Sequence, residues 1–347
     1  MLTYVLNSVK MIFQLILYSF SLFSFFVNFF FLCCNFLIPW LAIGIVLMII
    51  ATKFVKLRDP DREIIDELLA CNAKQEENQD VPSCLEFAIA NKGGVFDVPE
   101  NSIAALKQCL EKNCRNVLLD LSLTKCNKLV ILNKQTLEKA GIQEPIQQLT
   151  LDSLKEFNPV ENHALAQQFQ SEKILTLDEL LEINVKMHLK LYLLTTNCSN
   201  KMLEALKEAI RKHEKFVKQV VLVTTSPFIV YQLRKQFPNL ICGLWMDKTT
   251  LAKNSYLFKT SAILMAIYMA IFRNIISPVI GIKVVIIHKD EFNAHISALW
   301  RSVGIRPIVY TVNSPNEKRY FQQVVKTQYL TDSLRSEPQV IFKAKIR

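Results

Sequence analysis

The chain has 347 residues, with 41 Lys or Arg against 31 Asp or Glu and a net charge of +10, enough for one sizeable domain and a membrane segment. No basic stripe alternates with aromatic residues, so the positive charge indicates attraction to a membrane surface and argues against nucleic-acid binding. Nine scattered cysteines, without a Cys-x-x-Cys pair or a histidine at zinc spacing, exclude a disulfide framework and a structural zinc site.

The N-terminal segment is strongly apolar. Met11–Thr52 contains no charged residue and is rich in Phe, Leu and Ile. A hydrocarbon core needs about 20 apolar residues, so this segment has room for two spans. Asn35 and Pro39 lie near its middle and favour a turn. We therefore expect a transmembrane hairpin of Met11–Leu32 and Leu37–Ala51, with one long, kinked helix as the alternative.

Flanking charges bear on the orientation of this segment. Lys53, Lys56 and Arg58 follow it directly, whereas only Lys10 precedes it, so the positive-inside rule places the cluster in the cytosol. Asn197–Ser199 is a glycosylation sequon, which has meaning only in the lumen. We expect an integral membrane protein of the endoplasmic reticulum or plasma membrane, and the side that the domain faces stays open.

The stretch Glu86–Thr136 combines apolar runs with turn signals. Three runs have the length and composition of strands: Phe87–Ala90, Val117–Leu121 and Leu129–Leu132. The first is followed by Gly93-Gly94, where the backbone can turn sharply or approach a ligand closely. Pro99 then precedes a predicted helix, Ile103–Lys112, with Asn101 or Ser102 as its N-cap.

Strands and helices mostly alternate along the rest of the domain. The further predicted strands are His188–Leu194, Val217–Thr224, Leu240–Trp245, Lys283–Ile287 and Pro307–Val312. The predicted helices are Leu149–Asn158, Leu177–Asn184, Lys201–His213, Phe228–Phe237, Phe292–Val303 and Asn316–Lys326. Eight strands in this order are typical of a (β/α)8 TIM barrel, an α/β fold. The polar residues at or just beyond strand ends would then share one mouth: Asn91, Asp120, Asn133, Thr196 and Asn313.

An apolar insert separates the sixth and seventh predicted strands. Ser261–Phe272 and Asn274–Ile282 flank Arg273, and neither half is long enough to span a bilayer. A closed barrel cannot be divided by a membrane, so the insert is expected to dip into the bilayer or lie in its interface. An apolar flap packed on the barrel and a partner-binding patch are the alternatives. The predicted segments are a membrane segment at 1–56, a linker at 57–85, a barrel at 86–334 with the insert at 247–282, and a tail at 335–347.

A series of short motifs follows the strands in order. They are Asn91-Lys92-Gly93-Gly94, Pro99-Glu100-Asn101-Ser102, Leu118-Leu119-Asp120, Asn133-Lys134, Ile174-Leu175-Thr176-Leu177, Tyr310-Thr311-Val312-Asn313 and Tyr329-Leu330-Thr331-Asp332. In this order they resemble His-Arg-Gly-Gly, Pro-Glu-Asn-Thr, Glu-Leu-Asp, His-Asp, Ile-Pro-Thr-Leu, Trp-Thr-Val-Asn and Ile-Thr-Asp of the glycerophosphodiester phosphodiesterase family. The resemblance covers roughly Phe87–Leu334 and is nearest to the membrane-anchored animal branch, which also carries an apolar insert late in its barrel.

The resemblance implies a (β/α)8 fold and metal-dependent hydrolysis of phosphodiesters, with two histidines as acid and base and three carboxylates holding Mg²⁺ or Ca²⁺. Asn91 and Asn133 stand at the two histidine positions. Leu118 replaces the first metal carboxylate and Asp120 keeps the second, while the third falls at Leu194. An amide cannot exchange a proton near neutral pH and one carboxylate is a poor cation cage, so we expect impaired catalysis and a weak or absent metal site.

The remaining motif residues are candidates for ligand binding. The resemblance assigns Lys92, Gly93, Glu100 and Asn101 to the phosphate-ester ligand. Three of them have a plain structural alternative: Gly93 serves the turn, and Glu100 and Asn101 serve the helix start. Asp120 has one too, as a hydrogen-bonded barrel residue. Two other side chains in or beside strands, His188 and His288, are either structural or substitute bases.

Three hypotheses follow from these residues. The first is a membrane-anchored family member that binds a glycerophosphodiester-like or lysophospholipid-like ligand, or a protein partner, without turnover. The second is a working phosphodiesterase or lysophospholipase D with a rearranged site. The third is a non-catalytic membrane scaffold whose apolar regions carry the function and contact membrane lipids.

Overall fold

The computed structural model describes residues 2–69, 87–161, 163–246 and 262–335, in two compact units, Met1–Lys56 and Leu57–Arg347. Most of the predicted linker, the first part of the insert and nearly all of the tail lie outside the described residues.

The N-terminal unit is one continuous helix. It consists of α1 (Leu2–Leu32), a π-helical turn η1 (Cys33–Leu37) and α2 (Ile38–Val55), and the backbone stays right-handed at both junctions. The structure therefore has the long helix and lacks the preferred hairpin. The π turn ends two residues before Pro39, whose ring would clash with the carbonyl of Asn35 in a regular α-helix. Within this unit, Leu6–Gly44 is long and apolar enough to cross a membrane.

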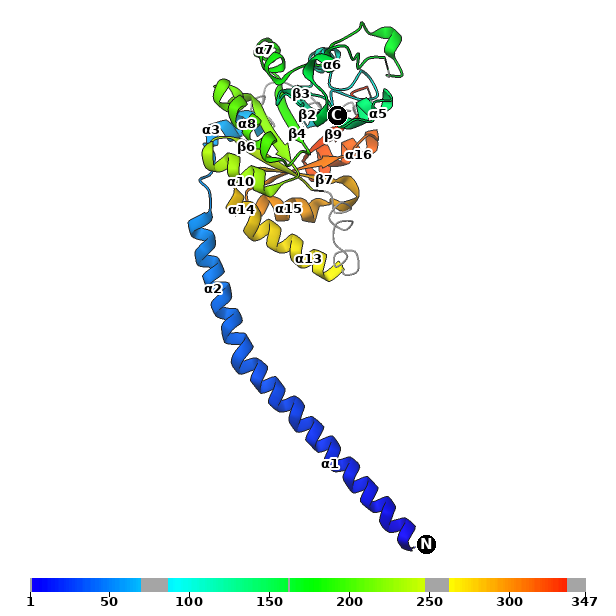
Figure 1. Cartoon of the computed structure of the whole chain (residues 1–347), viewed down its shortest axis with the longest axis vertical. Coiled ribbons are helices and arrows are strands. Elements are labelled where there is room, and N and C mark those ends of the chain that lie inside the picture. Colours follow the sequence, from blue (N-terminus) through cyan, green and yellow to red (C-terminus); the bar gives the residue numbers. More distant parts are fainter. Residues whose placement is uncertain (1, 70–86, 162, 247–261, 336–347) are drawn as a thin grey trace, which may run out of the picture. The chain divides into compact units, whose positions relative to one another are not determined.

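The second unit is a closed barrel of parallel strands surrounded by helices (Figure 1). Its eight strands are β1 (Ala88–Asn91), β2 (Asn116–Leu123), β4 (Lys190–Thr195), β5 (Val220–Thr224), β6 (Ile241–Met246), β7 (Val284–His288), β8 (Arg306–Tyr310) and β9 (Gln328–Thr331). The sheet closes because β1 pairs in parallel with both β2 and β9. The predicted (β/α)8 fold is confirmed.

The eight barrel strands are not the eight predicted from the sequence. The run predicted as the third strand forms β3 (Leu129–Ile131), which pairs antiparallel with β2 outside the barrel. Its connection from β2 is a tight turn with Asn127 in the left-handed region (φ 57°), too short for the crossover that parallel pairing needs. The eighth barrel strand is β9, whose residues the sequence analysis identifies as a motif and not as a strand. The fifth predicted strand also begins later, since Phe216–Gln219 forms the short helix α9.

Alternate strand residues point into the barrel and toward the helices. Ile89, Leu118, Tyr192 and Ile286 belong to the buried interior cluster, and a larger apolar layer lies between strands and helices. Each buried aliphatic side chain contributes about 1.5–3 kcal/mol of transfer free energy. The surrounding longer helices are α4 (Ile103–Glu111), α7 (Leu177–Met187), α8 (Asn200–Lys212), α10 (Pro227–Gln236), α13 (Ala262–Ile271) and α15 (Ala294–Ser302). Shorter helices are α5 (Lys134–Lys139), α6 (Leu151–Lys155), α14 (Ser277–Ile280) and α16 (Pro315–Arg319).

The helix α3 (Arg62–Leu69) is part of the barrel unit although the sequence suggested a linker there. Its Leu68 and Leu69 are buried in the same cluster as the barrel interior. Asp59 pairs with Lys283 at 2.6 Å, immediately before β7. This helix therefore caps the amino-terminal end of the barrel and leaves the opposite end for the cavity described below.

The described part of the insert is helical. It runs through α13, a π-helical turn η5 (Phe272–Ile276) and α14 without a break at Arg273. Phe272 and Ile280 are buried, whereas Ile263 is 72% exposed and Ile267 is half exposed. One face packs on the barrel and another stays open, which keeps the membrane and flap alternatives for the insert as predictions.

Candidate functional site

A cavity of about 810 Å³ opens at the carboxyl ends of the barrel strands. Its polar wall is formed by residues of the β1–β3 side, including Asn91, Lys92, Asp120 and Asn133. More apolar residues complete the lining: Leu194, Trp245, Tyr310, Pro145 and Ile146. Thr196 also lines it. Four of the five polar residues expected to share one mouth therefore line this cavity, whereas the fifth, Asn313, is not among its lining residues and contacts Asp332.

The turn after β1 directs Lys92 into the mouth. Lys92 has a left-handed backbone (φ 52°), and its carbonyl accepts a hydrogen bond from the Asn101 N–H at 3.0 Å. Gly93 also has a positive φ, and a Cβ atom there would lie 2.2 Å from the Cβ of Ala105. Gly93 is therefore required by backbone conformation and packing, the structural alternative of the sequence analysis.

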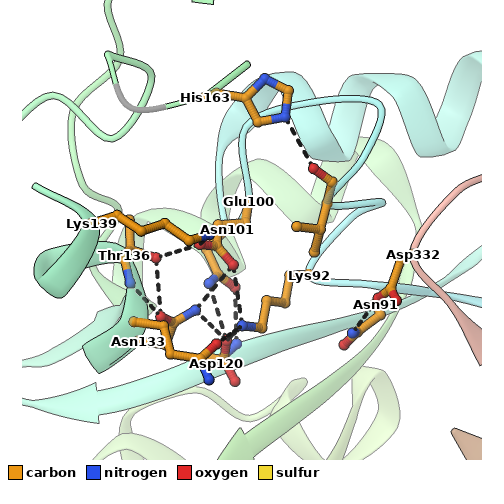
Figure 2. Close-up of polar contacts among 12 residues, drawn as sticks. Asn91, Lys92, Glu100, Asn101, Asp120, Asn133, Thr136, Lys139, His163 and Asp332 are labelled. Atoms are coloured by element: carbon orange, nitrogen blue, oxygen red, sulfur yellow. Dashed lines mark hydrogen bonds and ion pairs between the residues drawn. The ribbon is translucent and has the colours of Figure 1, made fainter. Parts of the chain in front are cut away.

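Asparagine amides hold Asp120 at the end of β2. Its Oδ2 accepts from the side-chain amides of Asn133 at 2.9 Å and Asn101 at 3.2 Å, while the Asp120 N–H donates to Oδ1 of Asn101 at 3.0 Å (Figure 2). The Asn133 carbonyl oxygen in turn caps the first turn of α5 by accepting from the Thr136 N–H at 2.8 Å. The residue at the second histidine position is thus fixed by its neighbours on both sides.

Glu100 belongs to the same polar network. Its carboxylate accepts from the Thr136 hydroxyl at 2.8 Å and pairs with Lys139 at 3.2 Å and Lys92 at 3.1 Å. The start of α4 does not depend on it, because the carboxylate of Glu172 accepts from the first two N–H groups of that helix at 2.7 and 2.9 Å. The helix-start alternative therefore fails for Glu100, and Ser102 is the N-cap.

Lys92 lies between the two carboxylates. Its Nζ is 3.1 Å from Oε2 of Glu100, 3.5 Å from Oδ2 of Asp120 and 3.3 Å from Oε1 of Gln135. Burial lowers the pKa of Lys92, but the charges of Asp120 and Glu100 outweigh burial and hold it above its ordinary value. Burial likewise raises the pKa of Glu100, while Lys92, Thr136 and Lys139 together lower it to about 2. Both groups are ionised at neutral pH.

A second polar cluster, built around the single carboxylate of Asp332, lies where β1, β8 and β9 end. The Asn91 amide donates to Oδ1 of Asp332 at 2.7 Å, and the Asn313 amide donates to Oδ2 at 2.7 Å. The Asp332 N–H donates to Oδ1 of Asn313 at 2.9 Å. Thr311 has φ 68°, a sparsely populated conformation for a β-branched residue, between β8 and Asn313. Asn91, at the first histidine position, therefore also donates its side-chain amide to a carboxylate.

The donor set does not fit a divalent-cation cage. Leu194 pairs in register with Asp120, and Leu118 lies in the apolar interior, so the two missing carboxylates would have flanked Asp120. Among the residues that the structure describes, no three His, Cys, Asp or Glu side chains are grouped to hold a metal ion. The Lys92 ammonium instead contacts both nearby carboxylates.

The two histidines considered as substitute bases lie at opposite ends of the barrel. His188 ends α7 and precedes β4, at the end of the barrel away from the cavity. His288 ends β7, and its ring centroid lies 4.9 Å from that of Tyr310, which lines the cavity. His163 bonds the Val95 carbonyl oxygen at 3.0 Å.

Several network residues were not singled out from the sequence. Thr136 follows the N-cap Asn133 by three residues, a spacing at which side chains on a helix are neighbours, and this is the signal that the sequence offers for it. Lys139 has no such spacing to Asn133. In the sequence, Asp332 is marked only as the last residue of the motif Tyr329-Leu330-Thr331-Asp332. Its contact with Asn91 spans 241 residues of sequence and has no local signature.

The fold and the mouth together define a (β/α)8-barrel protein with a polar cavity at the carboxyl ends of its strands, where such barrels place their chemistry. The chain belongs to the glycerophosphoryl diester phosphodiesterase family, whose model matches residues 92–335. It is 26% identical to human glycerophosphodiester phosphodiesterase 1 over 278 residues, covering 73% of this chain and 83% of the relative. The bovine protein of the same name is 26% identical over 258 residues, covering 71% and 78%.

Solved structures support the fold. A phosphodiesterase from Oleispira antarctica, in complex with the product sn-glycerol-3-phosphate, has a TM-score of 0.56 at 19% identity, covering 71% of this chain and 92% of that one. A putative glycerophosphoryl diester phosphodiesterase from Silicibacter pomeroyi has a TM-score of 0.55 at 14% identity, covering 73% and 95%.

Proposed function

We propose that this family member binds a phosphate-bearing, phospholipid-derived ligand at a membrane and turns it over weakly or not at all. One observation carries the proposal. Asn91 and Asn133, at the two histidine positions of the family motifs, each donate a side-chain hydrogen bond to a carboxylate. Amides held in this way support the shape of the mouth but cannot shuttle protons.

The loss of proton carriers has a large expected effect. A positioned general acid or base contributes about 10²–10⁴-fold to rate, and two such groups are replaced here. The carboxylates that would hold a divalent cation are reduced to Asp120, since Leu118 and Leu194 are apolar. Phosphodiester cleavage builds negative charge on oxygen, which such a cation would otherwise stabilise.

The cavity supports binding of an amphipathic phosphate ester. Its polar wall offers Lys92 and Lys134, whose ammonium groups bind phosphate oxygens. Its other wall includes Trp245 and Tyr310, whose rings are 4.5 Å apart. A lysophospholipid-like or glycerophosphodiester-like ligand would place its phosphate on the first wall and its less polar part on the second.

Membrane association is the second part of the proposal. Leu6–Gly44 and Ile263–Ile280 are both long and apolar enough to cross a membrane, and little of either is buried. The closed barrel on both sides of the second segment favours shallow insertion there over a crossing. The full chain is expected to remain in the membrane pellet after alkaline carbonate extraction, and release into the supernatant would contradict this part.

Turnover and binding can be measured on the same purified full chain in detergent. Glycerophosphoinositol and a lysophospholipid serve as probes, with Mg²⁺ or Ca²⁺ present. We expect thermal stabilisation by at least one probe without release of product. The reconstructed variant Asn91→His, Asn133→His, Leu118→Glu, Leu194→Glu is expected to gain hydrolysis. Hydrolysis by the natural chain that disappears in Asp120→Ala would sink the proposal.

A working enzyme with a rearranged site is the second candidate. His288 favours it, because this half-buried side chain stands at the carboxyl end of β7 against Tyr310 of the cavity. If His288 is the base, His288→Gln should lower kcat by about 10²–10⁴-fold with little change in KM. His188→Gln, at the other end of the barrel, is the matched control.

A further inference from the structure

The polar network of the mouth is balanced in charge by its own side chains. Two carboxylates, Glu100 and Asp120, face two ammonium groups, Lys92 and Lys139. A divalent cation added between the carboxylates would leave an excess of two positive charges. The network therefore needs no metal ion for neutrality.

The ammonium of Lys92 is fully engaged and largely enclosed. Its side chain is 16% exposed, and its three N–H donors match three acceptors: Glu100, Asp120 and Gln135. Two of the acceptors are charged, which makes these bonds stronger than neutral ones. Gln135 is exposed and lines the cavity, so it is the partner that an incoming anion can replace.

The backbone keeps Lys92 in this position. Its left-handed conformation is tied to the chain on both sides, because its carbonyl accepts from Asn101 and the Gly94 N–H donates to the Asn91 carbonyl at 2.8 Å. Asn101 itself contacts Asp120, so the turn that carries the lysine is joined to the carboxylate that it faces. A metal ion could enter only by displacing this side chain against its own counterions.

We propose that the Lys92 ammonium is the permanent cation of this site, that it excludes Mg²⁺ and Ca²⁺ from between Glu100 and Asp120, and that it takes a ligand phosphate oxygen in place of Gln135. This inference rests on the proposed function in treating the cavity as the ligand site. It adds that binding is independent of divalent cations. A cation of fixed single charge neutralises the ligand without creating the metal-bound nucleophile that hydrolysis uses.

Metal affinity is measured without ligand, by calorimetric titration of Ca²⁺ and Mg²⁺ into the full chain in detergent. The natural protein is expected to bind either ion more weakly than about 10⁻³ M, the weak end of protein Ca²⁺ sites. Lys92→Met, which keeps the length of the side chain and removes its charge, is expected to bind Ca²⁺ at least about tenfold more tightly. Lys92→Arg keeps the charge and should behave as the natural protein does.

Two results would overturn the inference. One is a natural protein that binds Ca²⁺ more tightly than about 10⁻⁴ M and loses this site in Asp120→Ala. The other is a folded Lys92→Met protein with unchanged Ca²⁺ affinity. The first result needs no lysine variant, so the inference can be refuted even if Lys92→Met fails to fold.

Ligand binding supplies the second arm, with glycerophosphoinositol titrated in EDTA and again in Ca²⁺. We expect equal affinities within about twofold, about tenfold weaker binding in Lys92→Met, and tighter binding in Gln135→Ala, which frees one N–H of Lys92. Binding that requires Ca²⁺ would overturn the inference. Metal-independent hydrolysis would refute the proposed function alone, whereas Ca²⁺ binding at Asp120 without hydrolysis would refute this inference alone.

Discussion

Two aspartates at the mouth, Asp120 and Asp332, are each held by two asparagine amides, yet they differ in the charges around them. Asp120 uses a single oxygen, Oδ2, which accepts from Asn101 and Asn133 and faces the Lys92 ammonium. Asp332 uses both oxygens, one for Asn91 and one for Asn313, and no cation pairs with it among the described residues.

The difference separates two ways of replacing a proton-transfer site. At Asp120 a fixed ammonium supplies a countercharge, so the negative charge of the aspartate is expected to contribute most to stability. At Asp332 amide donors occupy both oxygens, so the presence of two hydrogen-bond acceptors is expected to contribute most to stability. The family's histidine positions, Asn91 and Asn133, fall one on each side, and each contributes an amide N–H where the family resemblance places an imidazole.

Truncation of the two aspartates should have the largest effects. Asp120→Ala leaves two amides without their acceptor and removes one counterion of Lys92, so it is expected to lower the free energy of unfolding by about 3 kcal/mol. Asp332→Ala leaves two amides and should cost about 2 kcal/mol. Denaturant unfolding of both variants measures this, and a larger loss at Asp332 would break the comparison.

Replacement by asparagine should reverse that order. In Asp332→Asn an NH₂ group must face an amide donor, because both oxygens accept, and we expect a loss of about 2 kcal/mol. In Asp120→Asn the remaining oxygen can take the place of Oδ2, so about 1 kcal/mol is expected from the lost charge. Equal losses in the two variants would show that charge and acceptor number do not separate the sites.

The stability of the folded protein is expected to fall in acid because Glu100, the ion-pair partner of Lys92, becomes protonated. Its pKa is about 2 in the folded state and about 4.5 ordinarily, so its contribution is complete above about pH 4.5 and is lost as the pH falls toward 2. Glu100→Gln is therefore expected to flatten the fall in thermal stability over this range. The exposed Glu138→Gln is the control, and a slope unchanged in Glu100→Gln would contradict the assignment.

The smallest effect is expected at a surface pair beside the network. Lys134 lies 2.7 Å from Glu138 one helical turn away, but both side chains are well exposed, so Lys134→Ala should change stability by at most about 0.5 kcal/mol. Lys139→Ala, whose partner Glu100 is buried, is expected to cost more. Thermal unfolding of the two variants compares their stabilities directly. Equal losses of stability would show that the burial of Glu100 does not strengthen its ion pair with Lys139.

The sequence was sufficient for the barrel because strand-length apolar runs and helices alternate in it. The sequence does not predict which strand closes the barrel. The short strand Gln328–Thr331 carries only a weak local signal and pairs with β1, some 240 residues earlier. The run that forms the antiparallel β3 has the composition of a barrel strand, and composition does not report pairing direction.

Within the site, the motifs identified Lys92, Glu100 and Asp120, but their contacts depend on tertiary geometry. Nothing local indicates that Lys92 lies between two carboxylates or that Glu172 frees Glu100 from the start of α4. Pro39 suggested a turn, whereas a π-helical turn before it lets the N-terminal helix continue.

Closure of the barrel by β9 has a consequence for biosynthesis. The first strand cannot obtain its second neighbour until the ribosome has delivered Gln328–Thr331, about 240 residues after β1. Until then β1 and β8 each expose an unpaired edge, which is a template for association with other chains. A nonsense codon shortly before Gln328 would therefore leave nearly all of the apolar interior in place and still give an open sheet with two unpaired edges. We expect this product to aggregate or to be degraded.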